Sequence, residues 1–436
     1  MPLSRYLKIF PDPDRAGSHL VYSTRKGSLV RLSTARLVAA QAGTLDEAEA
    51  RRLTELAILV DDPAAEQADL AGLVMQTNAR AGRFRATVVL TLACNLACPY
   101  CFEEQFRDGR QMHPDTARLL VARLTGDHLT KGRDVQLRFY GGEPLMAVPL
   151  MEAISRPLQE AAAQVGRSFS CSMVSNGTLL TRPMVERLLP LGLKSVQVTL
   201  DGPPAIHDQQ RPFAAGGGSF ATILANLAEV ADLVSLELGG NFTRENFREF
   251  PAMLDAVLAA GLDPKRLGAV QFAPILPKSG RPASPELSGH CPACSDPWLA
   301  EATLYLRQDS LARGFKVLKP TMGICMVELE NDLVVDCDGA IYKCPGLMGW
   351  PELAVGTLAE GITDYGTSHH LHHWRQDQCL ECAYLPLCFG GCRLVNLLNQ
   401  GDMAGLDCRK PFFDATLEQM VLQDLRSRKA NASAPG

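Results

Sequence analysis

The sequence predicts an α/β fold in which six parallel strands form an incomplete, TIM-like (β/α)6 barrel with helices outside. Between residues 84 and 275 the chain alternates short apolar runs with longer helical segments, which is the pattern of repeated strand–helix units. One of these helices is predicted over residues 114–129, because Pro114 suits a first helical position. The strand candidates are residues 84–92, 135–140, 169–175, 195–200, 235–240 and 269–273.

Composition describes an ordinary globular protein. With 436 residues, of which 46% are hydrophobic, the chain is long enough for about two or three domains. The net charge of -5 comes without the basic patch that nucleic-acid binding needs, so we expect no nucleic-acid partner. No apolar run of about 18 residues or more and no targeting segment is seen. We therefore expect no membrane partner and a cytoplasmic location.

Residues 1–83 precede the barrel and contain no cysteine. Alternating residues 19–32 predict a hairpin, and helices are expected after it. A capping box of Thr44 and Glu47 is predicted to open the second helix, and a third is predicted over residues 63–80. The segment is interpreted as an α+β module that either recognises a peptide or packs as an extension.

The chain beyond the barrel divides into three further parts. Residues 276–324 read as a Pro-, Ser- and Gly-rich linker followed by a bridging helix over 298–313. Residues 325–410 form a cysteine-rich domain. Residues 411–436 are predicted to form a helix with a disordered tail from Ala430.

The first strand leads into Thr91-Leu-Ala-Cys94-Asn-Leu-Ala-Cys98-Pro-Tyr-Cys101-Phe, which places three thiols within eight residues. A structural zinc site needs a fourth ligand, and a disulfide would leave one thiol over in a reducing compartment. A 4Fe-4S cluster with one iron open to a small molecule needs three cysteines. The spacing favours the cluster over zinc and over a disulfide.

Polar or glycine-rich segments follow the other strands. Because ligands bind at the carboxyl ends of parallel strands, we expect these segments to converge on one mouth. Each segment taken alone is more typical of a turn, but their occurrence at successive strand ends favours a ligand-binding mouth. The segments are Gly141-Gly-Glu-Pro144, Ser175-Asn-Gly-Thr178, Asp201-Gly202 and Gly239-Gly-Asn241.

Together these motifs resemble the radical SAM superfamily, over roughly residues 85–275. The resemblance implies that a 4Fe-4S cluster binds S-adenosylmethionine through its open iron, and that reduction cleaves this cofactor to a 5'-deoxyadenosyl radical. By the same resemblance Cys94, Cys98 and Cys101 hold the cluster. The cofactor-binding residues it implies are Tyr100 and Phe102 near the adenine, Gly141, Gly142, Glu143 and Pro144 at the methionine amino group, Ser175 and Asn176 at the ribose or carboxylate, and Asp201, Arg211 and Asn241.

A second group of cysteines lies near the C-terminus. Because one cluster takes four thiolates, seven cysteines suggest two auxiliary 4Fe-4S clusters, and a pair of zinc ribbons is the alternative. Their order resembles the SPASM extension of radical SAM enzymes, in which they form two sets. These are Cys325, Cys344 and Cys392 for the first cluster and Cys379, Cys382, Cys388 and Cys408 for the second.

The first auxiliary set lacks a fourth ligand. Cys337 is one candidate, Cys291 or Cys294 is another, and an open iron is a third. The four histidines between His369 and His373 can bind metal, but a solvated helix is the more ordinary interpretation.

Among radical SAM enzymes, the chain resembles maturases of ribosomally made peptides. Tyr6-Leu-Lys-Ile, residues 240–246 and residues 382–392 look closest to the geopeptide maturase group. The resemblance implies oxidation of a precursor peptide, with cross-linking favoured, and a flavodoxin- or ferredoxin-type electron donor. It assigns no catalytic acid or base. Sulfatase-maturase-like oxidation is one alternative, although Pro345 replaces the expected aspartate after Cys344. A non-catalytic redox or sensor protein is the other.

Overall fold

The computed structural model describes residues 1–101, 103, 108–275 and 296–433. Its contacts divide the chain into two units, and each is made of segments that are distant in sequence. The first unit comprises Met1–Arg80, Lys319–Leu329 and His370–Gly436, and the second comprises Ala81–Leu318 and Glu330–His369.

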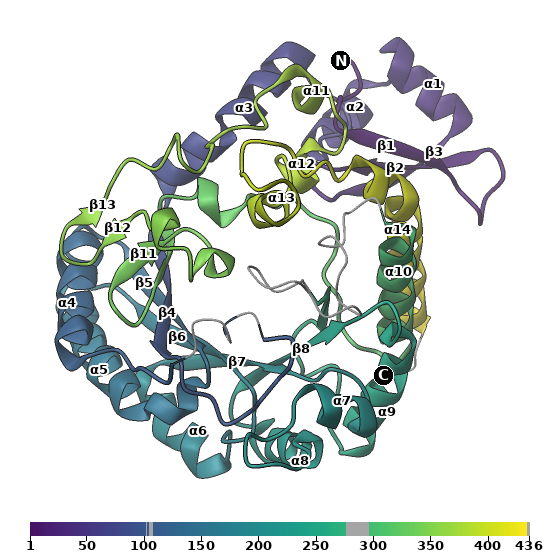
Figure 1. Ribbon diagram of the computed structural model, residues 1–436. Helices are drawn as coiled ribbons and strands as arrows, with labels where there is room; N and C mark the ends of the chain where they lie inside the picture. The colour runs from purple at the N-terminus through teal and green to yellow at the C-terminus, as the bar shows by residue number, and fades with distance from the viewer. Residues whose placement is uncertain (102, 104–107, 276–295, 434–436) are drawn as a thin grey trace. The chain divides into compact units, whose positions relative to one another are not determined.

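The second unit contains the predicted parallel sheet. All six strand candidates are strands, and they pair in chain order as neighbours in parallel (Figure 1). Their bounds are β4 (Arg83–Thr91), β5 (Asp134–Gly141), β6 (Phe169–Ser175), β7 (Leu193–Thr199), β8 (Ser235–Phe242) and β9 (Gln271–Pro274). No described strand joins β9 back to the opposite edge, so this sheet is open.

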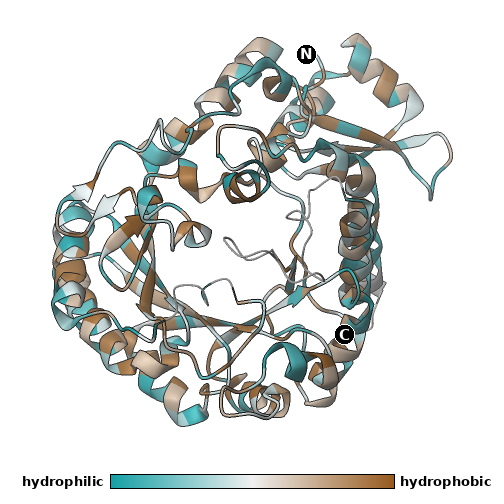
Figure 2. Cartoon of the chain, in the orientation of Figure 1, coloured by the Kyte–Doolittle hydropathy of each residue, from teal (hydrophilic) through white to brown (hydrophobic). Residues whose placement is uncertain are grey.

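Helices cover the outer side of this sheet, where α4, α5, α6, α8 and α9 are seen in Figure 1. Along most of these strands, buried apolar residues alternate with less buried, mostly polar ones, so the strands carry both hydrophobic and hydrophilic residues (Figure 2). Pro114 begins its helix as predicted, but that helix ends at Leu124 and a π-helical turn continues to Leu129. The helices are α4 (Pro114–Leu124), α5 (Val148–Gln164), α6 (Arg182–Leu188), α7 (Pro204–Gln210), α8 (Phe220–Val230), α9 (Phe250–Ala259) and α10 (Pro297–Ala312).

The sheet also continues beyond its first predicted strand. Strand β10 (Asp332–Val335) pairs in parallel with β4, and three antiparallel strands extend the edge further. These are β11 (Ala340–Tyr342), β12 (Gly356–Thr357) and β13 (Gly361–Ile362). Residues that the sequence places in the cysteine-rich segment therefore belong to the barrel sheet.

The first unit begins with an antiparallel sheet in the order β1 (Leu7–Pro11), β2 (Ser18–Ser23), β3 (Leu29–Ser33). The β2–β3 pair confirms the predicted hairpin. The helices that follow are α1 (Thr34–Ala42), α2 (Glu47–Glu55) and α3 (Pro63–Arg80), and the last has the predicted bounds.

The predicted capping box is wrong. Asp46 caps α2, because its carboxylate accepts the backbone N–H of Glu49 at 2.8 Å. Asp46 directly precedes the first helical residue and is as good a cap as threonine, so it takes that position. Thr44 instead donates its hydroxyl to the carbonyl of Ala39 at 3.4 Å, near the end of the preceding helix.

The N-terminal sheet and the cysteine-rich segment share one core within the first unit. Phe10, Leu20 and Tyr22 pack with Tyr384 and Phe413 in one buried apolar cluster. The helices that contribute are α12 (Leu385–Cys388) and α14 (Lys410–Ser433), and the segment also contains α11 (Asp377–Leu380) and α13 (Arg393–Gln400). Removing residues 1–80 would therefore expose apolar surface of the cysteine-rich segment.

Helix α14 also corrects the predicted tail. The helix runs to Ser433, so the backbone from Ala430 to Ser433 is helical where disorder is predicted.

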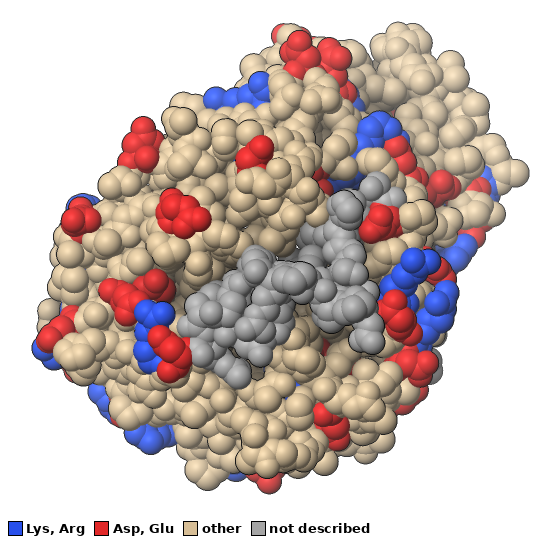
Figure 3. Space-filling view, in the orientation of Figure 1, with Lys and Arg blue, Asp and Glu red and all other residues tan. Residues whose placement is uncertain are grey.

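The surface is described by two observations. On the face drawn in Figure 3, Lys and Arg are interspersed with Asp and Glu. Among the described residues, none of the helices combines the length and the apolar character that crossing a bilayer requires.

Candidate active site

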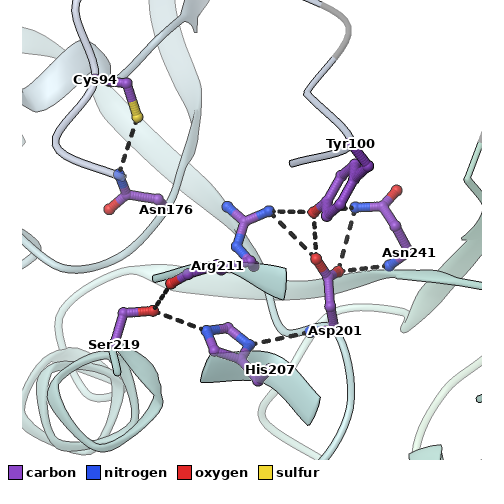
Figure 4. Close-up of polar contacts among 8 residues, drawn as sticks. All are labelled: Cys94, Tyr100, Asn176, Asp201, His207, Arg211, Ser219 and Asn241. Carbon is purple, nitrogen blue, oxygen red and sulfur yellow. Dashed lines mark hydrogen bonds and ion pairs between the residues drawn. The ribbon is translucent and has the colours of Figure 1, made fainter. Parts of the chain in front are cut away.

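The cysteine loop follows β4 at the carboxyl end of the strand. The Cys94 sulfur accepts the backbone N–H of Leu96 at 3.4 Å and the Asn176 side-chain amide at 3.7 Å (Figure 4). Burial raises the pKa of Cys98 to about 11. The charge of Arg211 lowers this pKa, and the neighbouring thiols of Cys101 and Cys94 raise it. The structure thus brings the three predicted thiols to one place and supplies N–H donors to one of them.

The predicted occupant of the three thiols is a 4Fe-4S cluster rather than a single ion. In the described part of the chain, no three His, Cys, Asp or Glu side chains converge as ligands of one metal ion do. A 4Fe-4S cluster takes each thiolate on a separate iron atom, so its ligands are spread more widely. Hydrogen bonds to a ligating sulfur, as Cys94 receives here, also tune such a cluster.

The Gly141–Gly142 pair lets the end of β5 approach this loop closely. The N–H of Gly142 donates to the Thr91 carbonyl at 2.9 Å, and the N–H of Glu143 donates to the Ala93 carbonyl at 2.8 Å. A Cβ on Gly142 would overlap the backbone of Ala93, and one on Gly141 would overlap the Thr91 carbonyl. The two glycines are therefore required by packing against the cysteine loop.

Replacing Gly142 with alanine is expected to destabilise the protein by about 1–3 kcal/mol, because the new methyl group is forced against backbone that cannot rotate away. Urea unfolding under anaerobic conditions measures this. Gly126→Ala is the matched control, since a Cβ there meets nothing within 4 Å. Equal unfolding midpoints for the two variants would contradict the close packing.

Glu143 ties two strand ends together. Its fully buried carboxylate accepts the N–H of Asn176 at 2.7 Å, the hydroxyl of Ser175 at 2.9 Å and the N–H of Leu145 at 3.0 Å. Burial raises the pKa of Glu143, while these donors favour the carboxylate. Pro144 then begins a short 3-10 turn, Pro144–Ala147. The predicted motif therefore joins the ends of β5 and β6 through hydrogen bonds.

The segment after β6 contacts the cysteine loop through its side chains. The Asn176 amide donates to the Asn95 side-chain oxygen at 2.8 Å, and its own oxygen accepts the Thr178 N–H at 2.9 Å. From α8, Asn226 donates to the carbonyls of Gly177 and Thr178 at 2.9 Å. Asn226 is not among the predicted site residues, although a polar residue inside such an apolar helix is a signal for it.

Four predicted residues form one hydrogen-bonded network around the buried carboxylate of Asp201 (Figure 4). Tyr100 donates its hydroxyl to the Asp201 carboxylate, and Arg211 donates to the Tyr100 oxygen at 2.6 Å. Asp201 also accepts the backbone N–H of Asn241 at 2.6 Å and lies 3.5 Å from the Arg211 guanidinium. Burial raises the pKa of Tyr100. The cysteine loop is thereby linked to the ends of β7 and β8.

Arg211 has donors left over in this network. Although burial disfavours its charge, Tyr100 and Asp201 raise the pKa of Arg211, so it stays a cation. Its Nε is buried and has no hydrogen-bond partner among the described residues. An orphaned, buried guanidinium N–H is costly, and an anionic group of a ligand would satisfy it.

His207 is a buried residue that the site prediction does not include. The backbone N–H of Asp201 donates to His207 Nδ1 at 3.2 Å, and Nε2 lies 3.0 Å from the Ser219 hydroxyl (Figure 4). Burial, followed by the charge of Arg211, lowers the pKa of His207 to about 3, so the ring is neutral near pH 7.

The second auxiliary set of cysteines comes together within the first unit. Burial raises the pKa of Cys379 to about 11, and Cys408 and Cys382 raise it further. Burial also raises the pKa of Cys388, to about 12, with Cys382 and Cys379 acting in the same direction. Mutual influence of this kind requires the thiols to be neighbours.

The remaining predicted ligands do not all lie in one unit, and some lie outside the described residues. Cys325 and Cys392 lie in the first unit. Burial raises the pKa of Cys325, and Cys392 also raises it. Cys344 lies in the second unit. Cys337 is buried there and donates its thiol to the Val89 carbonyl at 3.4 Å. Phe102, Cys291 and Cys294 lie outside the described residues.

The predicted solvated histidine helix is wrong. Residues 369–373 form turns, with positive φ at His370 and His372, and His369 is 1% exposed. The reason is the buried carboxylate of Glu328, which accepts the backbone N–H of His372 at 3.0 Å and pairs with Arg393. A buried acceptor selects this tight turn over a helix.

Residues 88–257, which contain the cysteine loop and four of the following strand ends, match the Radical SAM superfamily. This segment is a radical SAM domain. The predicted resemblance of the barrel is thus confirmed.

Similarity to other proteins extends beyond that domain. A PqqA peptide cyclase from Rhodopseudomonas palustris is 25% identical over 337 residues, which cover 73% of this chain and 84% of that enzyme. A mycofactocin maturase from Mycolicibacterium smegmatis is 27% identical over 73% of this chain and 80% of its own length. A GTP 3',8-cyclase from Synechococcus sp. strain CC9605 is 29% identical, but over 41% of this chain and 44% of that enzyme.

Solved structures share the fold. One is anSMEcpe with bound AdoMet and peptide, with a TM-score of 0.62 and 17% identity over 78% of this chain and 99% of that one. Another is SuiB from Streptococcus suis bound to S-adenosylmethionine, with a TM-score of 0.53 and 15% identity over 93% and 98% of the two chains. At these identities the similarity establishes the fold.

The cofactors of a radical SAM domain are a 4Fe-4S cluster and S-adenosylmethionine. The residues at the strand ends fit both, because three thiols match the cluster and the orphaned Arg211 Nε can serve a carboxylate. When bound, these cofactors supply a 5'-deoxyadenosyl radical that removes a hydrogen atom from a substrate carbon.

Proposed function

We propose that this protein is a radical SAM enzyme that oxidatively modifies a ribosomally synthesised peptide, with cross-linking of two side chains as the reaction. The alignment with the PqqA peptide cyclase carries this proposal, because its 337 residues exceed the 88–257 domain and include sequence outside the shared core. The GTP cyclase, which is not named for a peptide, aligns over a much smaller share of the chain.

The residues of the site have separate tasks in this proposal. Cys94, Cys98 and Cys101 hold the core cluster, and the Gly141–Gly142 backbone with the Ser175–Asn176 segment borders S-adenosylmethionine. Glu143 and Asn176 keep these segments in register through the hydrogen bonds described above. Arg211, held by Tyr100 and Asp201, offers its remaining donor to the carboxylate of the cofactor.

The cysteine-rich segment is proposed to hold two auxiliary 4Fe-4S clusters. Cys379, Cys382, Cys388 and Cys408 would hold one of them, and their mutual effect on pKa supports this set. Cys325, Cys344 and Cys392 would hold the other. Clusters of this kind can accept the electron that a substrate radical must lose in a net oxidation.

The N-terminal sheet is the proposed docking element for the peptide, and a flavodoxin- or ferredoxin-type protein is the proposed electron donor. No described strand pairs with the outer edge of β3, and an extended peptide can add as a strand to such an edge. Because this sheet shares its core with the cysteine-rich segment, docking is better tested by substitutions on its surface than by deleting it.

Coexpression with a candidate precursor peptide tests the proposed reaction. The peptide is expected to lose two hydrogens, about 2 Da, because one new bond replaces two bonds to hydrogen. Mass spectrometry with fragmentation locates the bond, and a protein carrying Cys98→Ala is the control. An unchanged mass with an inverted stereocentre would replace cross-linking by epimerisation.

A further inference from the structure

A short backbone segment, residues 211–214, lies directly on the cysteine loop. The N–H of Ala97 donates to the carbonyl of Pro212 at 2.9 Å, and the N–H of Ala214 donates to the carbonyl of Asn95 at 2.9 Å. An antiparallel bridge between Leu96 and Phe213 lies between these bonds. We name residues 211–214 the strap. Its contacts fall on the three residues that separate the first and second thiols.

His207 and Ser219 support the strap through hydrogen bonds. The Ser219 hydroxyl donates to the carbonyl of Arg211 at 2.6 Å, so it must accept its other hydrogen bond from His207 Nε2 at 3.0 Å. The proton of the neutral ring is therefore on Nε2, and Nδ1 accepts the N–H of Asp201. Both His207 and Ser219 are 0% exposed.

This chain of bonds joins two groups of the site that are ten residues apart. At one end is the backbone of Asp201, whose carboxylate organises Tyr100 and Asn241. At the other end is the backbone of Arg211, the first residue of the strap. A neutral imidazole with one donor and one acceptor suits this place, because its two ends must serve one N–H and one hydroxyl oxygen.

We propose that His207 and Ser219 are positioning residues that hold the strap against the cysteine loop and so set the affinity of the site for S-adenosylmethionine. Neither side chain needs to touch the cofactor. They act through the backbone of Arg211, whose guanidinium faces Tyr100 and Asp201, and through the loop residues between Cys94 and Cys98. The proposal depends on the radical SAM domain and is independent of the peptide chemistry.

The test compares Ser219→Ala with Ser310→Ala in the anaerobically reconstituted full-length protein. Ser310 is also 0% exposed, and its hydroxyl donates to the Leu306 carbonyl at 2.7 Å within α10, far along the chain from the strap. Hydrogen–deuterium exchange is followed in residues 94–101, and S-adenosylmethionine binding is measured by equilibrium dialysis. Without a peptide present, these readouts do not depend on the proposed function.

Ser219→Ala is expected to speed exchange in residues 94–101 and to raise the dissociation constant of S-adenosylmethionine about tenfold, as the loss of one buried hydrogen-bonding group does. Ser310→Ala should change neither quantity by more than about twofold. If both variants leave the two readouts at wild-type values, or if both shift them equally, the proposal is overturned.

Two histidine variants test the two hydrogen bonds of His207 separately. His207→Asn keeps an acceptor near Nδ1, and His207→Gln keeps a donor near Nε2. Because His207 and Ser219 act in series, combining His207→Asn with Ser219→Ala should weaken binding no more than the larger single effect. Additive effects on the dissociation constant would mean that the two residues act independently, which would also overturn the proposal.

Discussion

Replacing Cys98 with alanine is expected to abolish formation of 5'-deoxyadenosine from S-adenosylmethionine under reducing conditions. Cys98 is the middle thiol of the cysteine loop, and its pKa responds to both of the other thiols. The iron content should fall from about twelve atoms per chain to about eight, because one of three 4Fe-4S clusters is lost. Chromatographic detection of 5'-deoxyadenosine measures the activity.

Cys171→Ala is the control for this result. Cys171 is 3% exposed within β6, and no cluster is assigned to it. The variant should retain its iron and its cofactor cleavage. A wild-type protein with about four iron atoms and bound zinc would contradict the auxiliary clusters, and unchanged cleavage in Cys98→Ala would contradict the core cluster.

Replacing Arg211 with methionine is expected to raise the dissociation constant of S-adenosylmethionine more than about a hundredfold and to destabilise the fold by about 3–5 kcal/mol. The variant leaves the carboxylate of Asp201, which is 0% exposed, without its cationic partner. It also removes the buried donor assigned to the cofactor. Equilibrium dialysis and urea unfolding measure the two losses separately.

A second substitution distinguishes these two roles of Arg211. Combining Arg211→Met with Asp201→Asn removes both charges, so stability should recover in large part. Binding of S-adenosylmethionine should not recover, because the guanidinium is still missing. If affinity returns together with stability, Arg211 serves the fold alone and its assignment to the cofactor is wrong.

Local patterns were sufficient to predict the strands of the barrel. The apolar runs place β4 to β8 within two residues of their observed ends, since buried apolar residues recur along each strand. The Gly141–Gly142 pair and the cysteine spacing were also visible, because each is a short contiguous motif. The local capping prediction at Thr44 failed only because a closer residue, Asp46, was available.

Contacts between distant residues were not predictable in the same way. Residues 332–362 join the barrel sheet through pairing with β4, and nothing in their own pattern specifies that partner. The turn at residues 369–373 depends on the buried carboxylate of Glu328. In both cases the deciding partner is a backbone edge or a charge supplied by another part of the chain.

The sequence by itself determined the parallel strands, the thiols of the cysteine loop and the glycines that border them. Only the tertiary structure decided that Tyr100, Asp201, Arg211 and Asn241 form one network, and that His207 supports it from α7. The physical reason is that hydrophobic periodicity reports which face of a segment is buried. The hydrogen-bond partner of a buried polar group is determined by which other segment the fold brings within about 3 Å of it.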